Sequence, residues 1–174
     1  MIRFADVGDP EVYFTQHLDK GDYFLEGQES GGVWRGKGAA RLGLEGDIDT
    51  ADFAKLCQNR KPGTNEKLTP RDAKNRRPGV DLSFHCPKSV SLLYGLSGDE
   101  EIKEAVQSAV RKTMQELERD TQVRVRRGKE KNTDEDRTTG NLAWGEFVHK
   151  TARPVKGIPD PHLHVHCYIF NASY

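Results

Sequence analysis

The residues with the clearest capacity for chemistry are histidines near the C-terminal end of the sequence. Residues 159–171 read PDPHLHVHCYIFN, with His162, His164 and His166 at every second position. With His149, they make up four of the six histidines in the chain. Alternate side chains of a β-strand share a face, so these three imidazoles are predicted to point one way and the apolar residues between them into the core.

Imidazoles bind metal ions at about 2 Å, so the spacing along the strand limits which histidines can share one ion. Two residues along a strand span about 6.6 Å, which puts His162 and His166 about 13 Å apart. A metal site would therefore use one adjacent pair, either His162 with His164 or His164 with His166, and a third ligand from another part of the chain. His149 is the best candidate for this third ligand, since it ends the preceding predicted strand. Three imidazoles leave a coordination position open, which is typical of catalytic sites.

The elements that must position these histidines follow an α+β pattern. Strand character is found at residues 79–84, 121–126, 141–149 and 163–170. Pro87 suits the first turn of a short helix over residues 87–93. Residues 101–118 carry Ile102, Val106, Val110, Met114 and Leu117 at helical spacing. The sequence predicts one α+β domain over residues 1–174, with an antiparallel sheet flanked by helices and an exposed hairpin loop at residues 127–140.

Composition limits the partners. The chain has 27 Lys and Arg residues and 27 Asp and Glu residues, so its formal net charge is zero and does not indicate a nucleic-acid ligand. Any basic surface must therefore be local. The bases concentrate in residues 55–77, the predicted phosphate-facing segment. No apolar leader or membrane-length apolar run is found, and three scattered cysteines fit neither a disulfide framework nor a zinc ribbon. These features predict a soluble intracellular protein.

The glycine-rich stretch 31–40, GGVWRGKGAA, superficially resembles a phosphate-binding P-loop. The residue after Gly36 and Lys37 is Gly38, so the hydroxyl that would hold magnesium is missing. No strand is predicted before it. We therefore exclude nucleotide hydrolysis by this segment.

Four segments together carry a family resemblance. They are DYF, GKGAARLGLEGDID, GVDLSFHCPKSVSLL, and FVH followed by DPHLHVHCYIFN. In this order and at similar separations they resemble the N-terminal motifs of conjugative relaxases of the relaxase-helicase class, which are HUH endonucleases. The match runs over most of the chain, and four motifs in order are more specific than any one.

The resemblance implies the ligands and the partners. The metal ligands would be His149, His164 and His166, with His162 left out, and the ion would be one divalent metal such as Mg, Mn or Zn. The substrate would be single-stranded DNA beside a hairpin at a plasmid transfer origin, in the bacterial cytoplasm, with relaxosome accessory proteins as further partners. The chain would be the N-terminal part of a longer protein that also carries a helicase.

The resemblance also implies the reaction, in which a tyrosine hydroxyl attacks a phosphodiester and leaves a 5′-phosphotyrosine. Tyr23 and Tyr13 are the expected nucleophiles, with Tyr23 favoured because its context matches better. A phenol with a pKa of about 10 needs local help at neutral pH. Asp81 is expected to orient a ligand histidine and to receive the tyrosine proton. Tyr168, which shares the histidine face by parity, ranks third.

Phosphate contacts are expected from the basic residues of two segments, with base stacking on an aromatic side chain. The predicted DNA-binding residues are Arg76, Arg77, Arg124, Arg126, Arg127, Lys88 and Trp34. Two other functions stay open from the sequence. One is an HUH initiator of rolling-circle replication, which the N-terminal tyrosines disfavour. The other is a DNA-binding module that keeps the fold without nicking.

Overall fold

The computed structural model describes residues 2–5, 31–64, 66–69, 76–125, 135–152 and 159–172. Its strands are β1 (Ile2–Ala5), β2 (Val33–Arg35), β3 (Gly79–His85), β4 (Gln122–Val125), β5 (Glu135–Thr138), β6 (Trp144–Thr151) and β7 (Pro161–Phe170). Its helices are α2 (Lys37–Arg41), α3 (Thr50–Cys57), α4 (Lys88–Ser97) and α5 (Glu100–Arg119). None of the described helices is long and apolar enough to cross a membrane.

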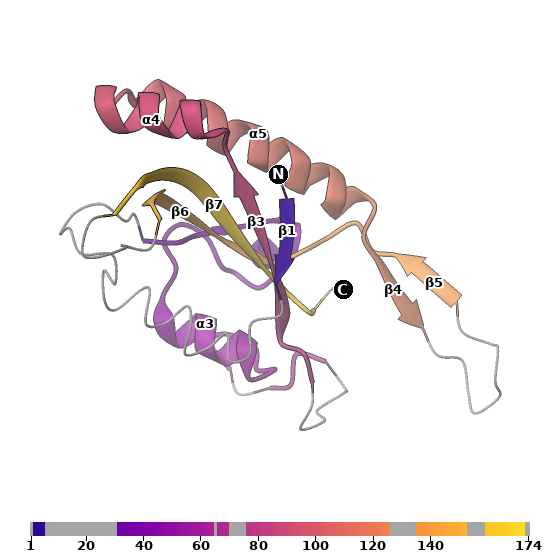
Figure 1. Cartoon of the computed structure of the whole chain (residues 1–174). Coiled ribbons are helices and arrows are strands. Elements are labelled where there is room, and N and C mark those ends of the chain that lie inside the picture. The colour runs from indigo at the N-terminus through magenta and orange to yellow at the C-terminus, as the bar shows by residue number, and fades with distance from the viewer. Residues whose placement is uncertain are drawn as a thin grey trace.

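Five strands form one antiparallel sheet in the order β1-β3-β7-β6-β2, which confirms the predicted α+β class (Figure 1). The predicted strands at residues 79–84, 141–149 and 163–170 correspond to β3, β6 and β7. The strand predicted at 121–126 is β4, but it lies outside this sheet. It pairs with β5 in a separate two-stranded sheet. The polar stretch predicted to be only a loop thus supplies a strand, because the chain turns back on itself before it reaches β6.

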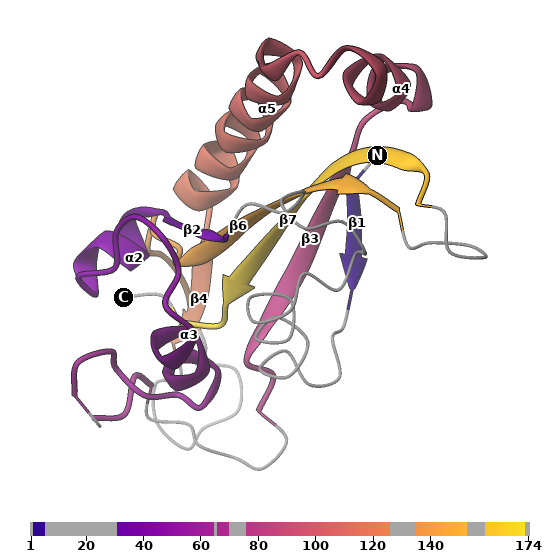
Figure 2. The same cartoon turned by 90° about the vertical axis from the view of Figure 1, so that its left-hand side faces the viewer.

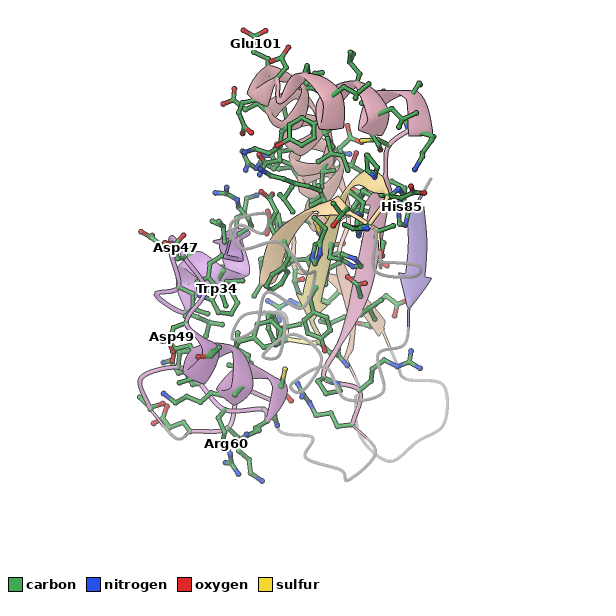
Figure 3. All side chains as sticks on the ribbon, turned by 60° about the vertical axis from the view of Figure 1, so that its left-hand side comes forward. Trp34, Asp47, Asp49, Arg60, His85 and Glu101 are labelled. Carbon is green, nitrogen blue, oxygen red and sulfur yellow. The ribbon has the colours of Figure 1, made fainter. Side chains whose placement is uncertain are left out.

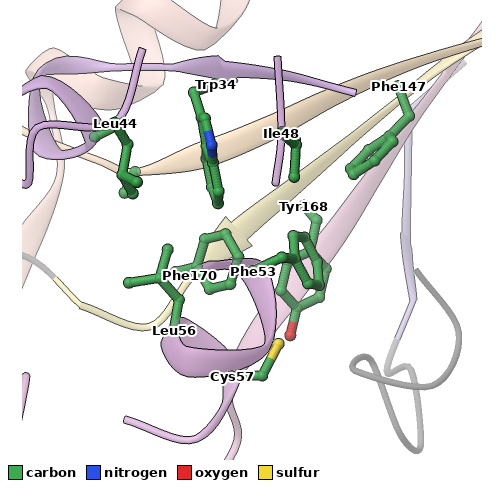
Figure 4. Packing of buried hydrophobic residues seen from close by; sticks show 11 residues of the cluster. Trp34, Leu44, Ile48, Phe53, Leu56, Cys57, Phe147, Tyr168 and Phe170 are labelled. Atoms are coloured by element: carbon green, nitrogen blue, oxygen red, sulfur yellow. The ribbon is translucent and has the colours of Figure 1, made fainter. Parts of the chain in front are cut away.

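Both faces of the five-stranded sheet are covered, with α4 and α5 on one face and α3 on the other (Figures 1 and 2). Alternation along β7 divides its side chains between the two faces. Toward α4 and α5 the fully buried residues of β7 are Leu163, Val165 and Cys167. Toward α3, Tyr168 and Phe170 pack around Phe53 (Figure 4). β7 is therefore the central strand of the molecule, held rigidly from both sides.

Two buried glutamates fasten α5 to its neighbours. Glu146 of β6 accepts hydrogen bonds from Arg111, the shortest at 2.7 Å, and this contact raises the pKa of the Arg111 guanidinium. Glu118 accepts the backbone N–H groups of Lys37 at 2.7 Å and of Leu142 at 2.9 Å. Buried carboxylates are costly unless they are paired in this way. They hold the helix in a defined register over the sheet.

The apolar face of α5 differs at its end from the predicted one. Val110 and Met114 are buried as expected, and the next buried position is Glu118. Leu117, predicted on the same face, is 43% exposed. Positions four apart lie above one another on a helix, so 110, 114 and 118 form the buried row and 117 falls beside it.

The glycine-rich stretch 31–40 itself forms β2 and then α2, and the residues directly before it lie outside the described part of the chain. The structure adds a second reason against nucleotide hydrolysis by this segment. The first backbone N–H groups of α2 already donate inside the protein, Lys37 to Glu118 and Gly38 to the Leu142 carbonyl at 2.7 Å. A phosphate would have to displace a buried carboxylate from this helix end. Of the three cysteines, Cys57 and Cys167 are buried and Cys86 is half-buried.

Candidate active site

Five histidines gather on the face of the sheet that also carries α3. His164 is at the centre of the group, because in the strand register it lies opposite His149 of β6 and opposite His85 of β3. His162 and His166 flank it along β7. The alternation predicted from the sequence thus puts these side chains on one face, and the sheet adds a histidine from each neighbouring strand.

The three predicted ligands lie close to one another. Ring centres are separated by 5.1 Å for His149 and His164, 5.0 Å for His149 and His166, and 5.1 Å for His164 and His166. Three imidazoles that bind one ion at about 2 Å in a tetrahedral arrangement have centres roughly 5 Å apart. The ring spacing therefore fits a shared ion.

The hydrogen bonds of two of these rings settle which nitrogen faces the group. Nδ1 of His164 donates to the carbonyl of His162 at 2.8 Å. Nδ1 of His166 donates to Oδ2 of Asp81 at 2.7 Å. In each ring the lone pair is left on Nε2, the nitrogen that a metal would take.

Asp81 of β3 is buried and bound to the histidine group, where the sequence predicted it. Its Oδ2 accepts from His166 and also from the hydroxyl of Ser83 at 3.1 Å. Its other oxygen, Oδ1, is buried without a hydrogen-bond partner in the described part of the structure. One carboxylate oxygen thus contacts an imidazole, and the other is buried beside it.

The nitrogen atoms of the three predicted ligands do not converge on one point in this structure. Within the described residues, no three side chains of His, Cys, Asp or Glu meet the geometry of a formed metal site. The residues nevertheless fit one, because the three ring centres have the spacing of imidazoles that share an ion and a carboxylate contacts His166. Burial, together with the nearby imidazoles, lowers the pKa of His164 to about 3. Its ring is therefore neutral at physiological pH, which is the form that binds metal.

The two tyrosines predicted as nucleophiles, Tyr13 and Tyr23, lie outside the described residues. Of the described tyrosines, Tyr168 is 1% exposed among the aromatic residues around Phe53. Tyr94 is buried on the other face, where its hydroxyl donates to Glu100 at 2.9 Å. Tyr168 is therefore a core residue.

Trp34 is also a core residue, which corrects its predicted role in base stacking. It is 4% exposed, and its ring stacks on Phe53 with centres 6.2 Å apart. Figure 4 shows both side chains in one apolar cluster. A base needs an open ring face on which to stack. The signal that could have revealed this is the apolar side chains that pack around it, Leu44 and Ile48, which follow in the sequence.

The basic residues that were predicted to bind DNA differ in their surroundings. Arg76 donates to two backbone carbonyls, that of Cys57 at 3.3 Å and that of Asn171 at 3.2 Å, so it ties the end of α3 to the end of β7. Arg77 is exposed. Lys88, at the start of α4, contacts Asp160 at 3.3 Å and the carbonyl of Pro161 at 3.0 Å. The backbone of Arg124 lies in β4, and Arg126 and Arg127 lie outside the described residues.

Sequence reasoning missed His85. It stands alone in the sequence, between a strand and a proline, so no spacing pattern marked it. The register of β3 against β7 brings it opposite His164, with ring centres 5.5 Å apart. Figure 3 shows it near the beginning of β7.

An antiparallel sheet with a His-Val-His pair on its central strand and a third histidine from the next strand is the arrangement expected of an HUH endonuclease. Comparison with known proteins agrees. The TrwC relaxase family matches residues 7–174, and the chain belongs to this family.

The multifunctional conjugation protein TraI of Escherichia coli strain K12 is 35% identical over 99% of the chain. The chain spans 10% of the length of that protein. A solved structure of the conjugative relaxase TrwC, metal-bound and in complex with oriT DNA, is 31% identical with a TM-score of 0.78. The chain covers 57% of it. TrwC bound to a 27-mer DNA with the recognition hairpin and cleavage site is 32% identical, with a TM-score of 0.73.

Proposed function

We propose that the chain nicks one strand of DNA at a plasmid transfer origin and transfers that strand, through a 5′-phosphotyrosine intermediate. The observation that carries the proposal is the contact of the Asp81 carboxylate with His166, at the edge of a group of three imidazoles with ring centres about 5 Å apart. The substrate we propose is single-stranded DNA beside a hairpin, as bound by the related TrwC. The reaction would take place in the bacterial cytoplasm, with relaxosome proteins as further partners.

His149, His164 and His166 would hold one divalent ion through three ring nitrogens. When bound, the ion would polarise a non-bridging oxygen of the scissile phosphate and offset the negative charge that grows there in the transition state. The metal-bound structure of TrwC supports an ion in this family. Imidazole ligands favour the later transition metals in intrinsic affinity, although Mg and Mn are also compatible with catalysis on phosphate.

Tyr23 is proposed to attack the phosphorus atom. Its oxygen would form the new P–O bond, the bond to the 3′ oxygen would break, and that oxygen would leave as a 3′-hydroxyl after taking up a proton. Oδ1 of Asp81, buried and without a described partner, is the proposed acceptor of the tyrosine proton. Ala5, the last described residue before Tyr13 and Tyr23 in the sequence, lies opposite Asp81 in the sheet.

We expect Asp81→Asn to weaken metal binding by about 10- to 100-fold, because it removes the carboxylate charge that orients the His166 ring. Chelator competition on the folded variant measures the affinity. Ser83→Ala is the matched control, since its neutral hydroxyl contacts the same carboxylate oxygen and, at 3.1 Å, Nδ1 of His166, so its loss removes contacts at the same place without removing a charge and should have a smaller effect. Equal affinity for the ion in the parent and the Asp81→Asn variant would contradict this role.

For DNA affinity, we expect Arg77→Ala to flatten the dependence of log K on log salt by about 0.7, the contribution of one phosphate contact on a single strand. Arg77 is preferred to Arg76, because loss of Arg76 would also break its bonds to the Cys57 and Asn171 carbonyls. Arg119→Ala removes the same charge from the end of α5 and should leave the slope unchanged. An unchanged slope for Arg77→Ala would place the strand elsewhere, most simply over Arg124, Arg126 and Arg127.

The proposal as a whole is tested by incubating the chain with labelled single-stranded oligonucleotides from the transfer origin, with and without a divalent metal. We expect metal-dependent cleavage that leaves protein attached to the 5′ end of the downstream fragment. Binding without cleavage under every metal would favour the DNA-binding module instead. Cleavage that depends on a tyrosine downstream of the histidines would favour a replication initiator.

A further inference from the structure

A second pair of histidines lies beside the proposed three-histidine group. Nδ1 of His85 and Nε2 of His162 are 3.1 Å apart, and the two rings are stacked with centres 5.2 Å apart and planes at 26°. The proposed reaction uses neither residue. The pair joins the end of β3 to the beginning of β7, in the region where Figure 3 labels His85.

An irregularity in the sheet accompanies this contact. His149 pairs with His164 and Thr151 pairs with Pro161, so β7 has one residue more than β6 between these two pairs. An extra residue of this kind forms a β-bulge, which increases the local twist and redirects side chains, and bulges are over-represented next to active sites. His162 lies in the bulged stretch. It meets His85 diagonally, although the direct partner of His85 in the register is His164.

The distance between Nδ1 of His85 and Nε2 of His162 is compatible either with a shared proton or with a bound metal ion. A proton shared in a hydrogen bond needs about 3 Å between them. Two imidazoles that bind one ion at about 2.0–2.1 Å in tetrahedral geometry have nitrogens roughly 3.3 Å apart. Replacing the shared proton by an ion would therefore require a shift of only a few tenths of an ångström.

The two histidines are accessible from solvent. Both histidines are partly exposed, so an ion can reach them from solvent and fill its other positions with water. The nearby ammonium of Lys88 would repel a cation, but it contacts the carboxylate of Asp160 at 3.3 Å, which offsets its charge. Asp160 is two residues before His162 and is exposed.

We propose that His85 and His162 form a second metal site, distinct from the three-histidine group, that takes one divalent transition ion of the imidazole-preferring class, such as Co, Ni, Cu or Zn. Two protein ligands make this site weaker than a three-imidazole site. Mg, which prefers oxygen ligands, would not occupy it. The site depends on the register of β3 and β7 and on the bulge between β6 and β7, so it stands even if the chain does not nick DNA.

Titration of the metal-free full chain with Co²⁺ tests the proposal, with bound metal counted per chain and the visible absorption of bound cobalt followed. We expect two equivalents, the second bound at least about tenfold more weakly because it has one ligand fewer. His85→Gln and His162→Gln should each abolish the weaker equivalent and keep the tighter one. His149→Ala should do the reverse, weakening the tighter one while the weaker remains.

Three results would overturn the second site. They are a single equivalent in the parent, a second equivalent that survives in both glutamine variants, and loss of the tighter equivalent on His162→Gln alone. The last would mean that His162 is a ligand of the main site. Circular dichroism of each variant shows whether it is folded, and since the two glutamine variants act on different strands, one misfolded variant leaves the other to decide.

Discussion

Tyr23→Phe is expected to abolish the covalent protein–DNA adduct while the chain keeps its affinity for single-stranded DNA. The substitution removes only the hydroxyl, so the nucleophile is lost and the aromatic ring stays. Loss of a covalent nucleophile should lower the nicking rate roughly a thousandfold or more. Adduct formation is measured on a denaturing gel with a labelled oligonucleotide, and affinity is measured separately by fluorescence anisotropy.

Two further phenylalanine variants control this experiment. Tyr13→Phe should still form the first adduct and should fail only where a second strand transfer is required. Tyr168→Phe should behave as the parent, because that side chain is buried around Phe53. Should Tyr13→Phe alone lose the first adduct, the order of the two tyrosines would be reversed. If only Tyr168→Phe were inactive, the relaxase mechanism itself would fail for this chain.

His164→Ala is expected to empty the main metal site, whereas His162→Ala should leave its ion in place. His164 lies at the centre of the group, opposite His149 and within 5.1 Å of the His166 ring centre. Without it, two imidazoles remain, and the bound ion should fall from about one per chain to about zero after dialysis. Elemental analysis of the dialysed protein measures the ratio, and dialysis also removes any ion from the weaker pair of His85 and His162.

The comparison between the two alanine variants is what identifies the ligand set. Both remove an imidazole from β7, so general damage to the strand should affect them similarly. Metal loss with His162→Ala and retention with His164→Ala would assign the site to the other end of the group, around His85. Equal loss in both would mean that the strand, and not a particular ring, had been disturbed.

Much of the site could be predicted from the sequence, because it depends on local periodicity. Alternation along one strand puts His164 and His166 on one face and Leu163 and Val165 in the core, and this holds in any sheet. The amphipathic spacing of residues 101–118 likewise predicted α5 with nearly correct ends. The choice between the two adjacent histidine pairs came from the family resemblance, since the spacing fits both.

Only the tertiary structure decided which distant residues meet these elements. Strand register brought Asp81 to His166 and placed His85, which no pattern marked, opposite His164. Because α3 packs against the sheet, Trp34 and Tyr168 are core residues. The guanidinium of Arg76 donates to backbone carbonyls of two segments that are far apart in the sequence. Periodicity acts within one element, so the sequence alone predicted the strand that carries the histidines. Burial and strand register depend on contacts between residues far apart in the chain, so only the fold determined which residues surround that strand.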